Sequence, residues 1–272
     1  MNEIPIIETS DIPIIFTAGI AFILLLATSF LVITFLNQRK KWQIENEMGK
    51  LKEQQQNQLI EAAVRSEEME RHRIAEMLHD EVGAILSSVR MHFANINSNQ
   101  LDDKGKSLHE KSKELLDEGI QKVRTISHNL HSTLLKEFGL NEAIRNFMTK
   151  TVQGTLVKVE TDLDNNYHIE TAETDLGVYR IVQELTNNIL KHAHADYINI
   201  SSKIKGENLE LVIRFNGSGL SQEEFEELRF RQEGLGLKNI QNRIILLKGN
   251  IHFEKNKKDN RIILTIPVST DI

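Results

Sequence analysis

The feature that most constrains this chain is a run near its N-terminus, residues 12–36, that contains no charged side chain. About 20 apolar residues are enough for a helix to span the hydrocarbon core of a bilayer. Acidic Glu3, Glu8 and Asp11 precede the run, and basic residues 39–41 follow it. Because basic residues collect on the cytoplasmic side of membrane spans, we expect a single transmembrane helix with the N-terminus outside and the remainder of the chain inside.

A cleaved signal peptide is the alternative interpretation of this run. It requires basic residues before a shorter apolar segment and a cleavage site after it, and here the order of charges is reversed. We therefore expect residues 1–11 to form a short extracytoplasmic tail and residues 37–69 to form a juxtamembrane helical linker. The chain has no Cys, which fits a reducing compartment and excludes thiol catalysis. Its net charge of -6 argues against direct nucleic-acid binding.

Residues 70–136 carry a helical pattern, with apolar side chains recurring in steps of three and four along two segments. The polar stretch between them, residues 97–106, predicts a turn, so the two helices form an antiparallel hairpin. Because the two apolar stripes of one hairpin bury little surface, we expect two hairpins to pair in a dimeric four-helix bundle. The first stripe comprises Ile74, Leu78, Val82, Ile85, Val89, Phe93 and Ile96, and the second comprises Leu116, Ile120, Val123, Leu130 and Leu134.

The pattern of apolar and polar residues changes after Gly139. We expect residues 137–272 to form a separate domain in which strands are interleaved with helices. Such a pattern predicts an α+β sandwich. We therefore expect an α+β protein with a transmembrane helix, a helical-hairpin dimerisation domain and a sandwich domain, in that order. Strands are predicted at 156–163, 197–205, 209–215, 251–255 and 262–268, and helices at 172–194 and 236–247.

The first candidate for chemistry is His79, which lies one residue off the first apolar stripe and directly precedes Asp80. A carboxylate beside an imidazole fixes the ring tautomer and makes the other ring nitrogen a better nucleophile. Gly83, one turn further on, leaves space for an approaching group. Taken alone, a surface histidine beside a chance acid explains the same residues.

The second candidate is a helix face followed by two glycine loops. Glu184 and Asn188 are four residues apart and share one face, and an amide oxygen is a suitable ligand for Mg²⁺ held through phosphates. Lys191 and His192 add cationic or donor groups beside them. Glycines allow backbone N–H groups to approach phosphate oxygens, although a polar helix face and two flexible turns would look similar. The glycines are Gly217 and Gly219 in the first loop and Gly234 and Gly236 in the second.

In combination and order, these motifs resemble bacterial sensor histidine kinases of the subfamily that pairs with LuxR-type response regulators. The resemblance covers roughly residues 65–268 and is highly specific. It is carried by residues 70–83 (ERHRIAEMLHDEVG), 134–140 (LLKEFGL), 183–193 (QELTNNILKHA), 234–240 (GLGLKNI) and 242–244 (NRI).

The resemblance implies a bacterial inner-membrane homodimer that uses ATP and Mg²⁺. It implies that His79 accepts the phosphoryl group with Asp80 as its polarising partner, that Glu184 assists transfer and that Asn188 binds Mg²⁺. Lys191 and the loop at 234–236 would contact phosphates. The phosphoryl group would then pass to an aspartate of a separate LuxR-type regulator, and the stimulus would arrive through the anchor, the linker or a sensory partner protein.

The chain departs from the family pattern at three positions. Phe215 occupies the place of the Asp that hydrogen-bonds the adenine amino group, and Asn216 cannot replace it without breaking the glycine spacing. Losing a hydrogen bond to a charged group predicts roughly 10- to 100-fold weaker or less base-selective nucleotide binding. Ala84 stands where the family often has a Gln used for dephosphorylating the regulator, and Asn260 lies where a Gly-Thr usually precedes the last strand.

Three functions compete on this sequence. The first is an active, membrane-anchored, ATP-dependent histidine kinase. The second is a dimeric signalling scaffold of the same fold that has lost the reaction, which Phe215 favours and the retained His79, Asp80, Glu184 and Asn188 oppose. The third is a serine-phosphorylating anti-sigma kinase, which the His-Asp pair and the hairpin argue against.

Overall fold

The computed structural model describes residues 12–96, 101–130, 133–167, 171–229, 235–256 and 258–268. The predicted tail at 1–11 and Gly234 lie outside these ranges. The chain divides into two compact units, Met1–Gln58 and Leu59–Ile272.

Helix α1 (Ile12–Met77) contains the apolar run. In the part of the chain that the structure describes, one helix near the N-terminus is long and apolar enough to cross a membrane, with a window of mean hydropathy 2.6. Side chains in this segment are exposed, for example Phe22 at 63% and Leu25 at 65%. A helix segment that is apolar on all sides and exposed is suited to lipid, so the apolar run lies within a helix that could span a membrane.

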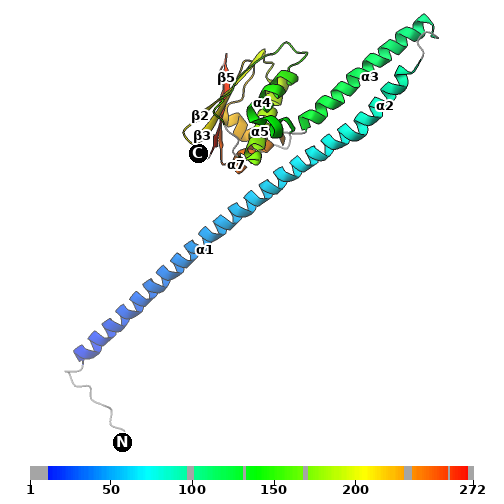
Figure 1. The fold of residues 1–272 in the computed structure, drawn as a ribbon. Coiled ribbons are helices and arrows are strands. Elements are labelled where there is room, and N and C mark those ends of the chain that lie inside the picture. Colours follow the sequence, from blue (N-terminus) through cyan, green and yellow to red (C-terminus); the bar gives the residue numbers. More distant parts are fainter. Residues whose placement is uncertain are drawn as a thin grey trace. The chain divides into compact units, whose positions relative to one another are not determined.

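The predicted hairpin is confirmed. A short π-helical segment, η1 (Leu78–Val82), follows α1 and leads into α2 (Gly83–Ala94), and α3 (Asp103–Leu130) lies antiparallel beside α2 (Figure 1). Ala75 and Ile120 are buried within it, and the Ser127 hydroxyl donates a 3.0 Å hydrogen bond to the Ala75 carbonyl. Part of the first stripe is exposed, as at Ile85 (63%) and Val89 (38%), and Ile126 of α3, which lies outside the second stripe, is 50% exposed.

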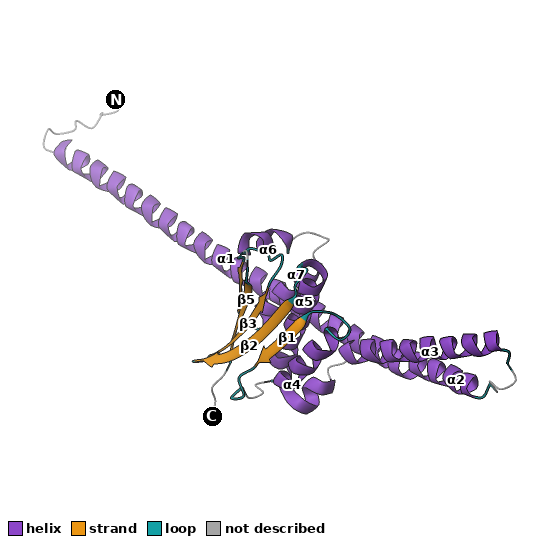
Figure 2. Cartoon of the chain, turned by 90° about the horizontal axis from the view of Figure 1, so that it is seen from above, coloured by secondary structure: helices purple, strands orange, loops and turns teal. Residues whose placement is uncertain are grey.

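The remaining elements form an α+β domain whose mixed five-stranded sheet has the order β1-β2-β3-β5-β4. The β1–β2 pair is parallel and the other pairs are antiparallel. Helices α4, α5 and α7 cover one face of the sheet (Figure 2). The elements are α4 (Thr133–Thr151), β1 (Lys158–Asp162), α5 (Ala172–His192), β2 (Tyr197–Lys205), β3 (Asn208–Phe215), α6 (Gln222–Leu228), α7 (Leu235–Leu246), β4 (Asn250–Glu254) and β5 (Asn260–Pro267).

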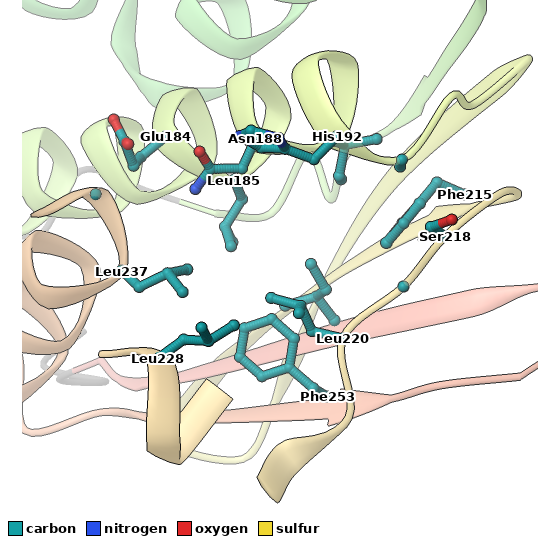
Figure 3. Close-up of a pocket in the computed structure, with 15 residues that line it drawn as sticks. Glu184, Leu185, Asn188, His192, Phe215, Ser218, Leu220, Leu228, Leu237 and Phe253 are labelled. Atoms are coloured by element: carbon teal, nitrogen blue, oxygen red, sulfur yellow. The ribbon is translucent and has the colours of Figure 1, made fainter. Parts of the chain in front are cut away.

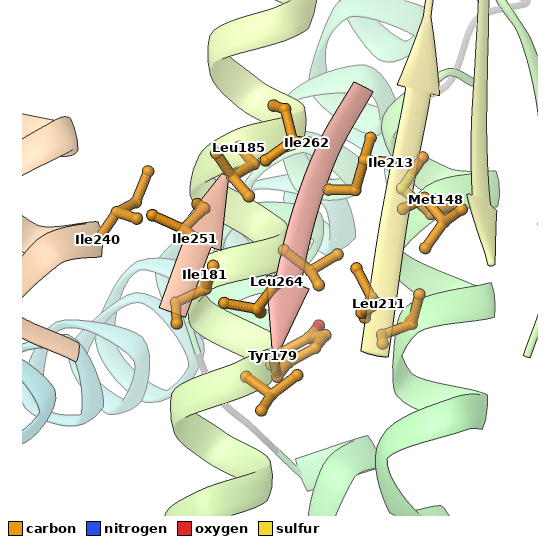
Figure 4. Close-up of a cluster of buried hydrophobic side chains, with 14 of the residues drawn as sticks. Met148, Tyr179, Ile181, Leu185, Leu211, Ile213, Ile240, Ile251, Ile262 and Leu264 are labelled. Atoms are coloured by element: carbon orange, nitrogen blue, oxygen red, sulfur yellow. The ribbon is translucent and has the colours of Figure 1, made fainter. Parts of the chain in front are cut away.

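The core of this domain lies between α5 and the sheet (Figure 4). Alternate residues of β3 and β5 are buried, as expected for strands with one face on a core. The side chain of Thr171 caps α5 by accepting a hydrogen bond from the Thr174 amide. All five predicted strands and both predicted helices are present, with ends shifted by no more than two residues. The helical turns of α4 beyond Gly139 and the short α6 were not predicted.

Candidate functional site

His79 lies in the π-helical segment η1 rather than in regular α-helix. Its Nδ1 is 2.8 Å from an Asp80 carboxylate oxygen, and the two side chains are 71% and 75% exposed. With Nδ1 bonded to the carboxylate, Nε2 is the ring nitrogen left to react. Single π-turns recur at functional sites because they shift the side chains that follow. The sequence predicted the His-Asp pair but gave no signal for the π-turn.

A shallow cavity of about 310 Å³ adjoins His79. It is lined by residues of η1, α2 and α3, including Gly83, Ala84, Ser87 and Arg124. A Cβ placed on Gly83 would make an ordinary 3.5 Å contact with the Leu78 carbonyl oxygen, so space alone does not require glycine there. Arg124 was missed because it comes from α3, and only the folded hairpin brings it beside this cavity.

A second cavity, of about 380 Å³, lies in the α+β domain between α5, the first glycine loop, α6, the start of α7 and the sheet. Glu184, Asn188 and His192 line it from one face of α5 (Figure 3). The structure therefore brings together three of the predicted α5 residues. Lys191 is exposed and does not line the cavity, because it is one position off this face.

Three of the loop glycines, Gly217, Gly219 and Gly236, lie where a Cβ would overlap other atoms. Gly217 has φ +88°, and a Cβ there would overlap the Ala193 carbonyl oxygen. A Cβ on Gly219 would overlap the side-chain amide of Asn260, and one on Gly236 would overlap the carboxylate of Glu184. Gly219 and Gly236 also line the cavity. The backbone at the start of α7 is thus held against Glu184.

The end of the cavity opposite Glu184 is apolar. Phe215, the last residue of β3, is only 3% exposed, and Figure 3 shows its ring beneath His192 at the wall. Leu220, Phe253 and Ile262 line the same cavity. None of these four side chains can accept a hydrogen bond, so they offer a bound ring only packing contacts, and Ser218 beside Phe215 adds a hydroxyl to this wall.

The polar neighbours of Phe215 are engaged within the protein. Asn260 is its partner on β5, and its side-chain amide donates to the Gly217 carbonyl at 2.9 Å and accepts from the Asn256 amide at 3.1 Å. The Asn216 side chain accepts from the Asp196 amide at 2.8 Å. Both residues therefore hold the first glycine loop in place.

Comparison with known proteins matches each of these two parts to a family. Residues 70–135 match the family described as "Histidine kinase". Residues 173–270 match the family described as "Histidine kinase-, DNA gyrase B-, and HSP90-like ATPase". The first match contains the His79 hairpin, and the second contains the glycine loops and the larger cavity.

Among relatives, the chain is 25% identical over 217 residues to the "Sensor histidine kinase MctS" of Rhizobium johnstonii, covering 78% of this chain and 46% of that protein. It is 24% identical over 215 residues to the "Signal transduction histidine-protein kinase/phosphatase DegS" of Brevibacillus brevis, covering 76% and 54%. The chain spans about half the length of these relatives. A solved structure of the Acinetobacter baumannii histidine kinase AdeS has 18% identity and a TM-score of 0.41, covering 72% of this chain and 98% of that one.

A hairpin that carries a histidine, joined to a gyrase-like ATPase domain, defines a class of proteins. In this class the histidine that accepts a phosphoryl group and the site that binds the nucleotide lie on one polypeptide. The two matched regions follow each other in that order along the chain. The chain belongs to the histidine kinases.

Proposed function

We propose that the chain is a membrane-anchored sensor kinase that autophosphorylates His79 from Mg-ATP and passes the phosphoryl group to an aspartate of a response regulator. The observation that carries this proposal is the His79–Asp80 pair, with its 2.8 Å contact at Nδ1 and its exposed ring. This geometry suits an imidazole that must meet a phosphoryl donor presented by a separate domain.

The chemistry follows from the ring nitrogens. Nε2 of neutral His79 attacks the γ-phosphorus, the new N–P bond forms, and the P–O bond to the β-phosphate breaks to release ADP. The ring becomes positively charged, and its Nδ1–H remains hydrogen-bonded to Asp80, whose carboxylate stabilises that charge. Asp80 therefore raises the reactivity of Nε2 before transfer and stabilises the imidazolium that transfer creates.

The larger cavity would hold the nucleotide with its phosphates toward Glu184. The backbone at Gly236 opens α7, and a helix N-terminus favours anionic groups. The carboxylate of Glu184 and the amide oxygen of Asn188 are hard oxygen donors that fit Mg²⁺. In this proposal Asn188 would bind Mg²⁺, which when bound offsets phosphate charge, Glu184 would assist transfer, and His192 and Lys191 would contact phosphates. Gly217, Gly219 and Gly234 would let backbone N–H groups of the two loops approach the phosphates.

The assembly proposed here is a homodimer. Ile85 and Val89 of the first stripe, with Ile126 of α3, are exposed apolar side chains that a second copy would cover. We place residues 12–36 in the bacterial inner membrane with the N-terminus outside, because basic residues 39–41 follow the span. The regulator would be of the LuxR-type class, and a sensory partner protein would supply the stimulus.

A dimeric scaffold without the reaction is the second candidate function. Phe215 is the observation that favours it, since this buried ring stands where the family uses the Asp that binds adenine. We propose that Phe215 weakens nucleotide binding without abolishing it, and that Ala84 leaves the chain poor at dephosphorylating its regulator. Introducing Gln at position 84 would then raise the rate of regulator dephosphorylation.

The deciding experiment incubates the full chain in lipid nanodiscs with γ-labelled ATP and Mg²⁺, beside the His79→Gln variant. We expect acid-labile, alkali-stable label in the wild type and none in the variant, with nucleotide binding retained by both. Label that persists in His79→Gln would identify another acceptor. An unlabelled wild type at millimolar ATP, with the dimer intact, would favour the scaffold.

A further inference from the structure

The cavity beside His79 is lined from both helices of the hairpin and has a volume of about 310 Å³. Asp80 of η1, Ser87 of α2 and Arg124 of α3 supply polar groups to it. Among the described residues that line this cavity, Arg124 is the only Lys or Arg. Since a cavity of even about 15 Å³ admits one water, this space has room for a tetrahedral oxyanion together with water.

Arg124 is a cation without a protein partner in the part of the chain that the structure describes. Its side chain is exposed, and it forms no ion pair or side-chain hydrogen bond there. Ion pairs within a helix join residues three or four positions apart. At these positions around Arg124, α3 has Ile120, Gln121, Ser127 and His128, none of which is acidic.

The acidic side chains that precede Arg124 on α3 are paired with other cations. Asp117 lies 2.9 Å from Arg90 of α2, and Glu118 lies 2.6 Å from Lys122. Neither carboxylate can neutralise Arg124 without giving up its present partner. The guanidinium therefore keeps its full charge beside the cavity.

A phosphoryl group on His79 requires a cation beside the ring. Nδ1 of His79 is bonded to Asp80 at 2.8 Å, which leaves Nε2 to take the phosphorus. A phosphoryl group carries about two negative charges near neutral pH, and Asp80 places a further negative charge next to the same ring. Like charges at this range repel each other, and Arg124 lines the same cavity with the opposite charge.

The donors around the cavity fit an oxyanion in kind as well as in charge. A guanidinium presents parallel N–H donors that bind two oxygens of one phosphoryl group. Ser87 lies four residues after Gly83, on the same face of α2, and its hydroxyl adds a neutral donor to the same cavity. The two helices of the hairpin thus each contribute a donor beside the reacting histidine.

We propose that Arg124 and Ser87 form an oxyanion site that receives the phosphoryl group as Nε2 of His79 takes it, and that Arg124 is a catalytic residue for this transfer. The new N–P bond forms at Nε2, the bond from phosphorus to the leaving group breaks, and the phosphoryl oxygens come to lie against the guanidinium. With Mg-ATP the leaving group is ADP. With phosphoramidate, a small phosphoryl donor, it is ammonia. The inference rests on the proposed function for the first donor only.

The first test measures autophosphorylation of the full chain in lipid nanodiscs. Arg124→Gln removes the charge, and Arg124→Lys keeps the charge without the planar fork. Lys122→Gln is the matched control, because Lys122 is 72% exposed on the same helix and does not line the cavity. We expect Arg124→Gln to lower kcat about 10-fold or more with the KM for ATP unchanged, and Arg124→Lys to recover part of that loss. Ser87→Ala should lower kcat about 3-fold, since a neutral donor is weaker, and Lys122→Gln should stay within about 2-fold of the wild type.

The second test uses phosphoramidate, which reaches His79 without the ATP-binding domain. We expect the wild type to be labelled about 5-fold faster than Arg124→Gln, with His79→Gln giving the background, as measured by intact-protein mass. Equal labelling of the wild type and Arg124→Gln, or an equal loss in Lys122→Gln, would overturn the proposal. Normal autophosphorylation of Arg124→Gln with loss only of transfer to a regulator would also overturn it, because Arg124 would then bind the regulator. If the wild type takes label from phosphoramidate and none from ATP, the proposed function fails, while the comparison with Arg124→Gln still decides whether the oxyanion site exists.

Discussion

The two ends of the 380 Å³ cavity in the α+β domain are lined by residues of different chemistry. At one end, Glu184, Asn188 and the backbone at Gly236 present oxygen acceptors and a helix N-terminus. At the other end, Phe215 forms an apolar wall, and Asn260 behind it is engaged with the glycine loop (Figure 3). In the proposed function the first end would hold the phosphates and the second would meet the base, so the two tasks would be separable within one fold. Five variants test this separation.

The largest effect should come from the polar end. Replacing Asn188 with Ala removes an amide oxygen from the cavity, and loss of one preorganised polar group at a reacting phosphate costs about 100-fold or more in rate. The measurement is the initial rate of His79 labelling at saturating Mg-ATP. Asn187→Ala is the matched control, since Asn187 is adjacent on α5 but does not line the cavity. Equal losses in both variants would show that the helix, not the amide, was responsible.

A substitution at the apolar end of the cavity should strengthen nucleotide binding instead of weakening the reaction. Phe215→Asp restores an acceptor for a purine amino group and should tighten ATP binding roughly 10- to 100-fold, although a buried carboxylate will lower the melting temperature. The wild type should bind ATP and the triphosphate of unsubstituted purine riboside within about threefold of each other, whereas the variant should prefer ATP. Calorimetry measures both ratios, and Phe215→Leu controls for loss of the ring. An unchanged affinity in Phe215→Asp would mean that this wall does not meet the base.

Substitutions at two glycines should separate an effect on stability from an effect on the rate of phosphorylation. Gly217→Ala forces a side chain into φ +88° and against a backbone carbonyl, and should destabilise the domain by about 2 kcal/mol or more. Gly236→Ala displaces the carboxylate of Glu184 and no backbone atom, and should slow phosphorylation about 10-fold while leaving the melting temperature nearly unchanged. Thermal unfolding beside rate measurements distinguishes them. A melting temperature that falls equally in both variants would contradict this distinction between the two glycines.

The smallest effect on nucleotide binding should come from a substitution of Asn260. Its buried amide bonds the Gly217 carbonyl and the Asn256 N–H, so Asn260→Ala should destabilise the domain by about 1–2 kcal/mol. Because Asn260 holds the loop rather than the nucleotide, ATP affinity measured well below the melting temperature should fall less than in Asn188→Ala. A loss of affinity as large as that of Asn188→Ala would give Asn260 a direct role in binding.

Much of the fold could be predicted because its elements carry regular patterns. The hairpin stripes, the alternation in β3 and β5, and the loop glycines follow from local periodicity and backbone freedom. The helical turns of α4 beyond Gly139 escaped prediction because Gly139, with φ 77°, breaks the apolar stripe. The seven-residue α6 (Gln222–Leu228) is too short to show a clear period.

The candidate site was partly predictable for the same reason. The spacing of Glu184, Asn188 and His192 places them on one helix face from sequence alone, and the structure brings them to one cavity. Lys191 lies off that face and does not reach the cavity. Arg124 beside His79 depends on packing between two helices, which no local pattern specifies.

The sequence by itself determined the order of the domains, the apolar run at 12–36, the His79–Asp80 pair and the helix face of α5, because each depends on residues close together in the chain. Only the tertiary structure decided that Phe215 forms the cavity wall, that Asn260 is engaged with the glycine loop, and that Arg180 is buried against Glu68. Charge patterns predict where an arginine can be solvated. Whether it is instead desolvated and paired depends on residues far away in sequence, and this is settled only when the domains pack.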